Sequence, residues 1–485
     1  MSGKISCILP FAPTNELEVT IKALKASALV DKIVVVAPED VNLEGVAVIV
    51  SKVGLFASAT WKKIIEESLG DYVVVYSKTM ALEVGMNALE RMCKACDDTG
   101  AGLVYADFYE RKEGKLSAHP VVDYQQGSLR DDFDFGSLIL YKKEALLSAV
   151  KDMDADYIHA AMYDLRLRVS QSYELFHLPE LLYTEVELDT RKSGEKMFDY
   201  VDPRNRDRQI EMEVACTAHL KKVGAYLKPE FKQIEFSEEE FLVEASVIIP
   251  VRNREKTVAD AIESVLKQKT DFLFNLIIVD NHSTDKTTEI IQSFKDDRIV
   301  HIIPERDDLG IGGCWNRAVE DDRCGKFAVQ LDSDDLYIDE TVLDRIVKAF
   351  YEQNCAMVVG SYQMVNFKLE EIPPGLIDHK EWTPDNGRNN ALRINGLGAP
   401  RAFYTPVLRQ VKVPNTSYGE DYALGLNISR HYQIGRIYDP LYLCRRWDDN
   451  SDASLDIVKM NAHNFYKDKI RTMEFKARQQ MIAMR

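Results

Sequence analysis

Three carboxylates lie within four residues in the segment AVQLDSDDLY. The apolar residues 327–331 predict a buried strand, so Asp332, Asp334 and Asp335 are expected where that strand ends. Carboxylates this close repel one another unless a cation lies among them. Proteins hold Mg²⁺ and Mn²⁺ with one or two carboxylates together with substrate phosphate oxygens. The alternative is a solvated acidic turn before the helix expected at 341–350, and the motif alone leaves both interpretations open.

A second acidic pair, Glu420 and Asp421, lies in a GED motif ahead of the helical sequence ALGLNISRHY. The loop sequence PNTSY precedes the motif, so the pair is expected at a helix N-terminus. The helix dipole favours carboxylates at that position, and acidic residues are common there for stability alone. The functional alternative is a general base that removes a proton from an attacking hydroxyl group.

The composition limits the class of protein. The chain has 485 residues, 46% hydrophobic and 29% charged, which predicts two or three globular domains. The formal net charge of −17 argues against nucleic-acid binding and against a basic membrane-docking surface. The sequence predicts no transmembrane segment and no signal peptide. We interpret the isolated CxxC of Cys93 and Cys96 as reduced residues in a helix, so a cytoplasmic protein is expected.

Short apolar strands alternate with helices along the chain. Strands are expected at 5–11, 32–40, 46–50, 71–78 and 103–108, and helices at 15–28, 58–69 and 82–96. This alternation predicts a mostly parallel sheet covered on both faces, with ligands bound at the carboxyl ends of its strands. A further helix is expected at 206–227, with Ile210, Val214 and Ala218 forming its apolar face.

The pattern of the first half begins again at Ala245. SVIIPVRNREKTVADAIESVLKQ matches ISCILPFAPTNELEVTIKALKAS, and KFAVQLDSDD matches DYVVVYSKTM. Ser77 and Thr79 therefore stand opposite Asp332 and Asp334, so the first half lacks the acidic cluster. A repeat of about 240 residues predicts two copies of one domain rather than a solenoid.

The second half resembles a family 2 glycosyltransferase of the GT-A fold. The matching segments are, in order, SVIIPVRNR, IIVDNHSTD, DLGIGGCWNRAVE, LDSDD and the GED of SYGEDYALGL. The resemblance covers residues 245–447, and the first half is similar to a diverged copy. It implies an α/β protein with two tandem GT-A-like domains, each a mostly parallel sheet flanked by helices. It also implies transfer of a sugar from a nucleotide-diphospho-sugar donor, with inversion at the anomeric carbon.

The resemblance predicts four regions along the chain. They are a degenerate, non-catalytic domain at 1–187, a helical connector at 188–244, the catalytic domain at 245–452 and a helical tail at 453–485. The first domain is expected not to bind a metal–nucleotide complex, and to dock an acceptor, hold a partner or buttress the second domain. Its Asp164, near the position of the GED motif, is interpreted as structural. The tail either packs on its domain or mediates homo-oligomer formation.

Roles for the acidic residues follow from the resemblance. It assigns Asp280 to the nucleoside, Asp332 to the ribose or a metal-bound water, and Asp334 to a Mn²⁺ or Mg²⁺ ion that bridges the diphosphate. Asp421 is the base in this assignment, and Glu420 contacts the acceptor.

Further donor-binding residues are expected near the first strand and in the glycine-rich segment. They are Pro250, Arg252, Asn253 and Asn316, with Arg254 as an alternative to Arg252. For the arginines, the structural alternative is a surface ion pair. The GIGG of Gly310–Gly313 lacks the Lys-Ser/Thr of a phosphate-binding P-loop. Ser283, Thr284 and Asp285 are expected to cap the next helix, a structural role that is favoured for Ser283 or Thr284.

The chain departs from the family pattern near its end. Many relatives carry a His after a basic pair as third metal ligand, whereas here Trp447 follows Arg445 and Arg446. The metal would then be held by Asp334 with diphosphate and water, or with Asp448, and an arginine could neutralise the diphosphate. Trp447, like Trp382, either stacks on a sugar or belongs to the core.

A long segment, 372–401, lies between the metal strand and the base, and it is expected to be a loop without helices or strands. Long loops of this kind are usually functional or mobile. We assign it to acceptor recognition, with His379, Arg393 and Asn395 as candidates.

The sequence thus predicts a metal-dependent, inverting glycosyltransferase of bacterial-type polysaccharide or glycoconjugate synthesis. The default donor is a UDP-sugar, and the acceptor is a glycan, a lipid-linked sugar or another hydroxyl compound. A nucleotidyltransferase is one alternative, disfavoured because PVRNR stands where a glycine-rich phosphate loop is expected. A non-catalytic carbohydrate-binding or scaffold protein is the other. The expected location is the cytoplasm, or its periphery at the inner membrane face.

Overall fold

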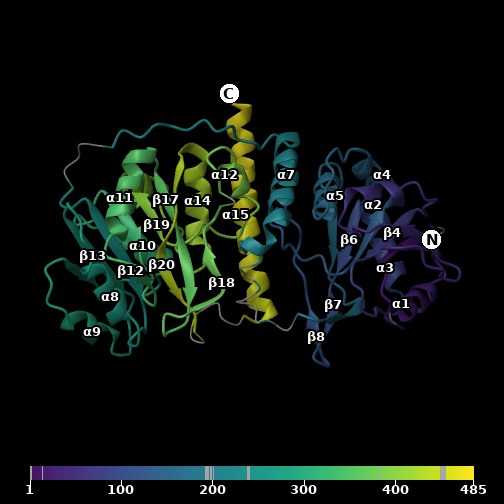
Figure 1. The fold of residues 1–485 in the computed structure, drawn as a ribbon, viewed down its shortest axis with the longest axis horizontal. Coiled ribbons are helices and arrows are strands. Elements are labelled where there is room, and N and C mark those ends of the chain that lie inside the picture. Colours follow the sequence, from purple (N-terminus) through teal and green to yellow (C-terminus); the bar gives the residue numbers. More distant parts are fainter. Residues whose placement is uncertain are drawn as a thin grey trace. The chain divides into compact units, whose positions relative to one another are not determined.

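The protein forms two compact units, which Figure 1 shows coloured along the chain. The computed structural model describes residues 3–13, 15–189, 191, 196, 199, 201–236, 241–380, 382–447, 450 and 455–484. Unit 1 comprises Met1–Lys192, Arg206–Ala225 and Leu455–Thr472. Unit 2 comprises Ser193–Asn205, Tyr226–Ser454 and Met473–Arg485.

Unit 1 is built on a seven-stranded sheet with the order β10-β6-β9-β4-β1-β2-β3. Its strands are β1 (Ile5–Pro10), β2 (Val30–Ala37), β3 (Ala47–Val50), β4 (Tyr72–Tyr76), β6 (Leu103–Ala106), β9 (Leu138–Lys142) and β10 (Leu175–Leu178). The neighbours β3, β2, β1 and β4 pair in parallel, whereas β9 runs antiparallel to β4 and β6. The central strands are apolar along their length because both faces of the sheet are covered.

A smaller sheet and the helices complete unit 1. The smaller sheet has the order β5-β11-β7-β8, with β5 (Glu83–Val84), β7 (Phe108–Lys112), β8 (Lys115–His119) and β11 (Tyr183–Glu187). The helices are α1 (Asn15–Lys25), α2 (Ser58–Ile64), α3 (Ala88–Thr99), α4 (Lys143–Lys151), α5 (Ala161–Val169) and α7 (Arg206–Lys222). The helix expected from residue 82 begins only at Ala88, because β5 pairs with β11 before it.

Unit 2 contains a nine-stranded sheet with the order β14-β13-β12-β15-β19-β17-β20-β16, and β18 pairs with β17. Its strands are β12 (Ala245–Val251), β13 (Phe274–Asp280), β14 (Ile299–Ile302), β15 (Phe327–Gln330), β16 (Leu336–Tyr337), β17 (Met357–Val365), β18 (Glu371–Ile377), β19 (Arg401–Tyr404) and β20 (Ile434–Arg445). Its helices are the 3-10 turn η1 (Pro203–Asn205), α8 (Val258–Leu266), α9 (Thr287–Ser293), α10 (Ile311–Val319), α11 (Val342–Gln353), α12 (Gly387–Asn390), α13 (Thr405–Val411) and α14 (Glu420–His431).

The main sheets of the two units have the same topology. The order β3-β2-β1-β4-β9-β6-β10 corresponds strand by strand to β14-β13-β12-β15-β19-β17-β20. In both, the fifth strand of this order runs antiparallel to its neighbours, and the last strand is parallel to the one before it. The α/β fold class predicted from the sequence is confirmed. That unit 1 is a diverged copy of unit 2 stays a prediction, with which the shared strand order agrees.

Two local predictions are wrong. Ile210, Val214 and Ala218 lie on the exposed face of α7, because α7 packs against α5 and buries the side chains of Met212 and Cys216 instead. The segment expected to be an unbroken loop between residues 372 and 401 contains most of β18 and all of α12. Strand β18 forms there because it pairs with the preceding strand β17 in an antiparallel hairpin.

The state of the CxxC thiols and the apolarity of the helices can be read from the structure. Cys93 and Cys96 are free, and burial raises the pKa of Cys96 to about 11, so its thiol stays protonated. Within the described residues, no helix has the length and apolarity to cross a membrane.

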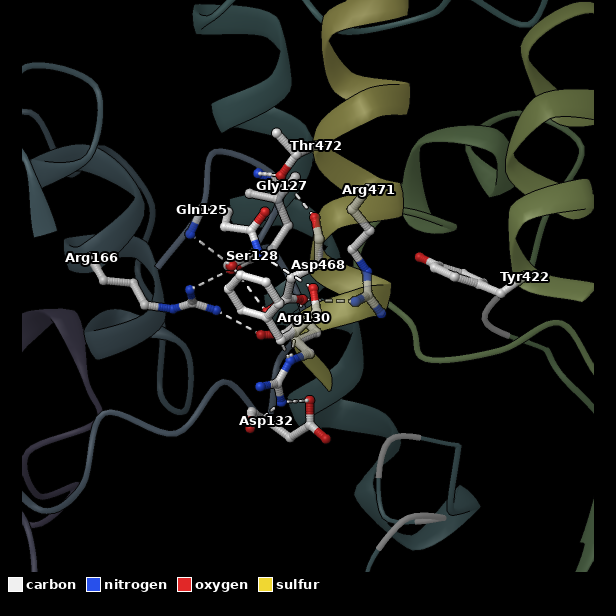
Figure 2. Close-up of polar contacts among 12 residues, drawn as sticks. Gln125, Gly127, Ser128, Arg130, Asp132, Arg166, Tyr422, Asp468, Arg471 and Thr472 are labelled. Carbon is white, nitrogen blue, oxygen red and sulfur yellow. Dashed lines mark hydrogen bonds and ion pairs between the residues drawn. The ribbon is translucent and has the colours of Figure 1, made fainter. Parts of the chain in front are cut away.

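The long helix α15 (Ile457–Ala483) is divided between the units at Thr472. In unit 1, Asp468 is fully buried and accepts a hydrogen bond of 3.0 Å from Ser128 Oγ (Figure 2). Its Oδ1 lies 2.9 Å from a terminal nitrogen of Arg471 and 3.3 Å from Nε of Arg130. Two buried guanidinium groups therefore share one buried carboxylate.

The other end of α15 supports unit 2. Arg478 donates to Glu474 at 2.8 Å and to the carbonyl of Arg388 at 2.8 Å. Arg388 in turn donates to the carbonyl of Ser429 in α14 at 2.9 Å, and Glu474 lies 3.4 Å from Arg430. These contacts fix the C-terminal half of α14, the helix that begins at Glu420.

Replacing Asp468 by Asn tests the buried charge cluster of unit 1. The change keeps the shape of the side chain but removes the charge that Arg471 and Arg130 share, while Arg130 keeps its contact of 2.9 Å with Asp132. We expect the free energy of unfolding of unit 1 to fall by about 3–5 kcal/mol, measured by urea denaturation. In the control Asp156→Asn, the lost partner is Lys62, at 3.1 Å on a carboxylate whose side chain is 89% exposed. The control should change stability by less than about 1 kcal/mol, and equal effects of the two substitutions would contradict this account.

Candidate active site

Several polar side chains meet at one edge of the unit 2 sheet. Strands β12, β13 and β15 are parallel neighbours, so their carboxyl ends lie at the same edge. Strand β19 runs antiparallel to β15, with Ala402 opposite Val329, so its first residue, Arg401, lies at this edge too. Residues that follow the parallel strands and the residue that begins β19 are thereby brought together.

The loops that follow β12 and β13 are tied to each other. Asn253 has a positive φ of 54°, and its side-chain oxygen accepts a hydrogen bond of 2.7 Å from the amide of Thr284. The amide of Asn253 donates to Ser283 Oγ at 3.0 Å. Ser283 and Thr284 therefore bridge two loops, and the prediction that one of them caps α9 is wrong. The amide of Thr287 at the start of α9 donates to Asp285 instead, at 2.9 Å.

Asp280 ends β13 and is fully buried. It accepts hydrogen bonds from the amide of Ser283 at 3.0 Å and from Thr288 Oγ1 at 2.5 Å, and His301 lies 3.6 Å away. Burial favours the neutral acid, but the nearby His301 and the hydrogen bonds from Ser283 and Thr288 outweigh it and hold the pKa of Asp280 well below its usual range. Asp280 is thus an ionised carboxylate at the site edge.

The other donor candidates near β12 differ in exposure. Pro250 lies within β12 and is half-buried, whereas the side chain of Arg252 is exposed. Arg254 is half-buried, and its Nε lies 3.8 Å from Asp334. Of the two arginines considered from the sequence, Arg254 is therefore the one near the acidic cluster.

The three carboxylates after β15 have different partners. Asp332 accepts from Gln330 Nε2 at 2.9 and 3.0 Å, and Asp335 is buried and accepts from the amide of Arg445 at 2.8 Å. Asp334 faces the side-chain amide of Asn450 at 3.3 Å. Burial and the charge of Asp334 raise the pKa of Asp335 well above its usual value, and burial also raises that of Asp332.

The cluster suits a divalent cation that takes part of its coordination from a substrate. Asp332 and Asp334 repel each other, and a cation between them would relieve that repulsion. In the part of the chain that the structure describes, no group of three or more His, Cys, Asp and Glu side chains could hold a metal. Two carboxylates suffice for Mg²⁺ or Mn²⁺ when phosphate and water supply the other ligands. Asp448 lies outside the described residues.

Arg445, considered from sequence as a diphosphate ligand, is held within the protein. Its side chain is 3% exposed, lies 2.7 Å from Asp260, and donates from Nε to the carbonyl of Asp334. It therefore fixes the backbone of the acidic cluster. Arg446 is half-buried, and its amide donates to the carbonyl of Val365 at 2.8 Å, which pairs this residue with the end of β17.

The two tryptophan candidates differ in position. Trp382 is 4% exposed, and its carbonyl accepts a hydrogen bond of 3.0 Å from Tyr438, which agrees with the core alternative. Trp447 is half-buried, with its indole nitrogen 3.5 Å from Asp334 and its ring 4.9 Å from that of Phe367. Of the two, Trp447 is the one beside the acidic cluster.

The GED motif begins α14, as expected. Asp421 lies 2.8 Å from a terminal nitrogen of Arg401, and its side chain is 26% exposed. The Oε2 atom of Glu420 is buried and has no hydrogen-bond partner among the described residues. Burial, and then the adjacent charge of Asp421, raise the pKa of Glu420 to about 8. Near neutral pH, Glu420 is therefore mostly a neutral acid beside the paired carboxylate of Asp421.

The glycine-rich segment holds the loop that leads to the GED motif. A Cβ atom on Gly312 would lie 1.8 Å from the carbonyl oxygen of Pro414, so only glycine allows this close packing. The side chain of Asn316 donates to the carbonyl of Val413 at 2.7 Å and accepts from its amide at 2.9 Å. The amide of Gly312 donates to the carbonyl of Thr416 at 2.9 Å. These contacts account for the motif without a phosphate, and the nucleotide contact expected for Asn316 stays a prediction.

The acceptor candidates of segment 372–401 are mostly buried. His379 is 2% exposed and Arg393 1% exposed, and Arg393 donates to the side chain of Asn390 at 2.7 Å. Asn395 is half-buried. Sequence reasoning missed the residue of this segment that contacts the GED motif, Arg401, because no motif marks it.

Comparisons with known proteins agree with this geometry. The family model "Glycosyl transferase family 2" matches residues 246–409. The UDP-Glc:alpha-D-GlcNAc-diphosphoundecaprenol beta-1,3-glucosyltransferase WfgD of Escherichia coli is 32% identical over 199 residues, which cover 40% of this chain and 72% of WfgD. The chain belongs to glycosyl transferase family 2. The family predicted from the sequence is thereby confirmed.

Two further relatives are longer than the region that matches this chain. An uncharacterized glycosyltransferase of Rickettsia felis is 30% identical over 194 residues, covering 40% of this chain and 31% of that protein. The poly(ribitol-phosphate) beta-N-acetylglucosaminyltransferase TarS of Staphylococcus aureus is 27% identical over 172 residues, covering 35% of this chain and 29% of TarS. The chain spans about a third of the length of the Rickettsia relative. The family match runs from β12 into α13, so the GED motif lies beyond it.

The raised pKa of Glu420 predicts a pH-dependent stability. Its pKa is 4.5 without the protein environment and about 8 in the folded protein, so between these values the folded state keeps a proton that the unfolded state loses. The contribution of Glu420 to the free energy of unfolding is therefore complete below pH 4.5, decreases as pH rises, and levels off above pH 8.

Glu420→Gln should remove this pH dependence. We expect the stability of the variant relative to the wild type to rise between about pH 5 and about pH 8.5, measured by urea denaturation. Glu320→Gln, at a glutamate whose side chain is 53% exposed, is the control and should show no such rise. A wild type and Glu420→Gln variant with parallel pH profiles would disprove the assignment.

Proposed function

We propose that unit 2 is a metal-dependent, inverting glycosyltransferase that moves a sugar from a nucleotide-diphospho-sugar to a hydroxyl acceptor. The observation that carries the proposal is the convergence on Arg401 of two acidic motifs. Asp421 of the GED motif pairs with its guanidinium group, and the charge of Asp332 acts on the same group. Direct transfer requires the group that binds the donor to lie near the group that activates the acceptor, and both of these motifs face the Arg401 guanidinium group.

The donor and acceptor classes are proposed from the relatives. The name of WfgD specifies UDP-glucose as donor and a sugar on diphosphoundecaprenol as acceptor, and the name of TarS specifies a poly(ribitol-phosphate). By analogy, the donor here is a UDP-sugar, and the acceptor is a glycan or lipid-linked sugar of polysaccharide synthesis. A lipid-linked acceptor would bring unit 2 to the inner membrane face.

The chain's own residues supply donor binding. Asp280, ionised at the end of β13, accepts hydrogen bonds from the base or ribose, and Asp332 accepts from the ribose or a bound water. Asp334 holds Mn²⁺ or Mg²⁺, which when bound stabilises the negative charge of the departing diphosphate. Arg254, 3.8 Å from Asp334, adds positive charge at the same place.

The chemical step is a single displacement at the anomeric carbon. Asp421 accepts the proton of the acceptor hydroxyl while the acceptor oxygen forms its bond to that carbon. The bond from the anomeric carbon to the diphosphate breaks at the same time, and the nucleoside diphosphate leaves with the electron pair. Glu420, neutral near pH 7, is suited to donate a hydrogen bond to an acceptor oxygen.

Unit 1 is proposed to lack this activity. Where unit 2 has its acidic cluster, unit 1 has Lys78, whose ammonium lies 2.5 Å from the buried carboxylate of Glu185 in β11. In sequence, this lysine stands between Ser77 and Thr79, the positions that match Asp332 and Asp334. The same ammonium lies 3.6 Å from Glu187, so Lys78 itself supplies the positive charge beside these two carboxylates, which supports a non-catalytic role for unit 1. Asp164 pairs with Arg168 at 2.6 Å, in agreement with a structural role.

Asp334→Ala tests the proposed metal site. In the wild type, UDP-glucose with Mn²⁺ should raise the melting temperature more than either alone, because metal and diphosphate bind together. The variant should lose this Mn²⁺-dependent increment, whereas Asp297→Ala, at an exposed carboxylate of the same unit, should keep it. An undiminished increment in Asp334→Ala would exclude Asp334 as the ligand.

Asp421→Asn tests the proposed base. Since the substitution removes the proton acceptor and leaves the donor site intact, the Mn²⁺-dependent increment with UDP-glucose should persist. Sugar transfer, followed as UDP release with a GlcNAc-diphospholipid acceptor, should fall by about 10²–10⁴-fold. Equal losses of nucleotide binding and transfer would remove Asp421 from the role of base. Parallel trials with other UDP-, GDP- and dTDP-sugars identify the donor if UDP-glucose is inactive.

A further inference from the structure

We propose that Arg401 is a positioning residue for sugar transfer. It holds the acceptor-side carboxylate Asp421 at a fixed position relative to the donor-side carboxylate Asp332. The inference rests on the function proposed above and goes beyond it, because Arg401 belongs to none of the motifs that define the site. Its location is set by the fold, since Arg401 begins β19 at the edge where β15 ends.

The backbone of Arg401 is tied to the donor side. Its amide donates a hydrogen bond of 3.1 Å to Gln330 Oε1. The nitrogen of the same side-chain amide donates to both oxygens of Asp332, at 2.9 and 3.0 Å. Gln330 is 4% exposed, and its carbonyl accepts a hydrogen bond of 2.9 Å from Tyr337. One buried side chain therefore connects the carboxylate of Asp332 to the main chain of Arg401.

The guanidinium group of Arg401 is tied to the acceptor side. A terminal nitrogen lies 2.8 Å from Oδ2 of Asp421, and the Arg401 side chain is 16% exposed. The same nitrogen donates to the carbonyls of Leu397, at 3.2 Å, and Gly398. Gly398 has a positive φ of 44°, and a Cβ atom there would lie 2.8 Å from Val359 Cγ1, so the residue must be glycine. The turn at 397–398 thus orients the guanidinium group toward Asp421.

The charges around Arg401 explain why an arginine is needed there. Facing it are Asp421 and Glu420 at the start of α14, Asp332 after β15 and Tyr442 of β20. Burial disfavours the charged guanidinium, but these groups, Asp421 first, raise its pKa, so Arg401 is always charged. Without this charge the carboxylates would repel one another, and Oδ2 of Asp421 would lose the ion pair that orients it.

The alternative is that Arg401 only stabilises the fold around β19, and the substitutions Arg401→Gln and Arg401→Lys separate the two roles. Arg323→Gln is the matched control, since Arg323 also pairs with an aspartate, Asp321, at 2.7 Å, but its side chain is 52% exposed. For each variant, kcat and the KM for UDP-glucose are measured from UDP release with Mn²⁺ across pH. The melting temperature is measured with and without UDP-glucose and Mn²⁺.

In Arg401→Gln we expect kcat to fall by about 10²-fold with little change in the KM for UDP-glucose, because the carboxylate that takes the proton is misplaced. The acidic limb of the kcat profile should move to higher pH, because losing the cation favours protonated carboxylates. Arg401→Lys should restore the position of that limb but only part of kcat. Lysine keeps the positive charge but lacks the planar guanidinium group with its several N–H donors. Arg323→Gln should match the wild type.

Three results would overturn the inference. An Arg401→Gln variant with wild-type kcat and pH profile would show that Arg401 has no part in transfer. A variant with a lowered melting temperature, a lost UDP-glucose increment and an unshifted pH profile would show a role in folding only. A wild type that releases UDP, GDP or dTDP from none of the tested donors would refute the proposed function itself and with it this inference. The first two results leave the proposed function standing, so the two failures are distinguishable.

Discussion

Repulsion among carboxylates is the constraint on which the site in unit 2 depends. Asp332, Asp334 and Asp335 follow one strand, and the GED motif adds two more acidic groups to the same edge. Burial, and after it the charge of neighbouring carboxylates, raises the pKa values of Asp335 and Glu420. Arg401 supplies part of the positive charge that these carboxylates need. A bound divalent ion would supply more, and it would also neutralise the diphosphate.

The scaffold places these groups through contacts far apart in sequence. The antiparallel register of β19 on β15 brings Arg401 beside Asp332. Helix α10 fixes the loop before the GED motif through its glycines and Asn316, and the buried Arg478 of α15 supports the other end of α14 through Arg388. The rigidity required of a transfer site therefore comes in part from α10 and α15, which lie outside the two acidic motifs.

The sequence reveals the parts of the site that follow strands or begin helices. Asp332 and Asp421 could be found because an apolar run ends before one and a loop signal precedes the other. Arg401 could not, because its importance arises from strand register across 71 residues and no local pattern encodes it. Arg445, considered with Arg446 as a diphosphate ligand, has a side chain that holds the backbone of the acidic cluster, a contact that its place in the sequence does not reveal. The exposed stripe of α7 was mistaken for a packing face because periodicity does not say which face meets a neighbour.

The central claim, a divalent ion held by the acidic cluster and a nucleotide diphosphate, is tested most directly by crystals grown with Mn²⁺ and UDP. Anomalous diffraction locates the manganese without assumptions about the reaction. The account predicts an anomalous peak within coordination distance of Asp334, about 2–2.3 Å, that also contacts the diphosphate oxygens. UDP bound in unit 2 with no manganese at Asp334, or manganese bound only elsewhere in the protein, would contradict it.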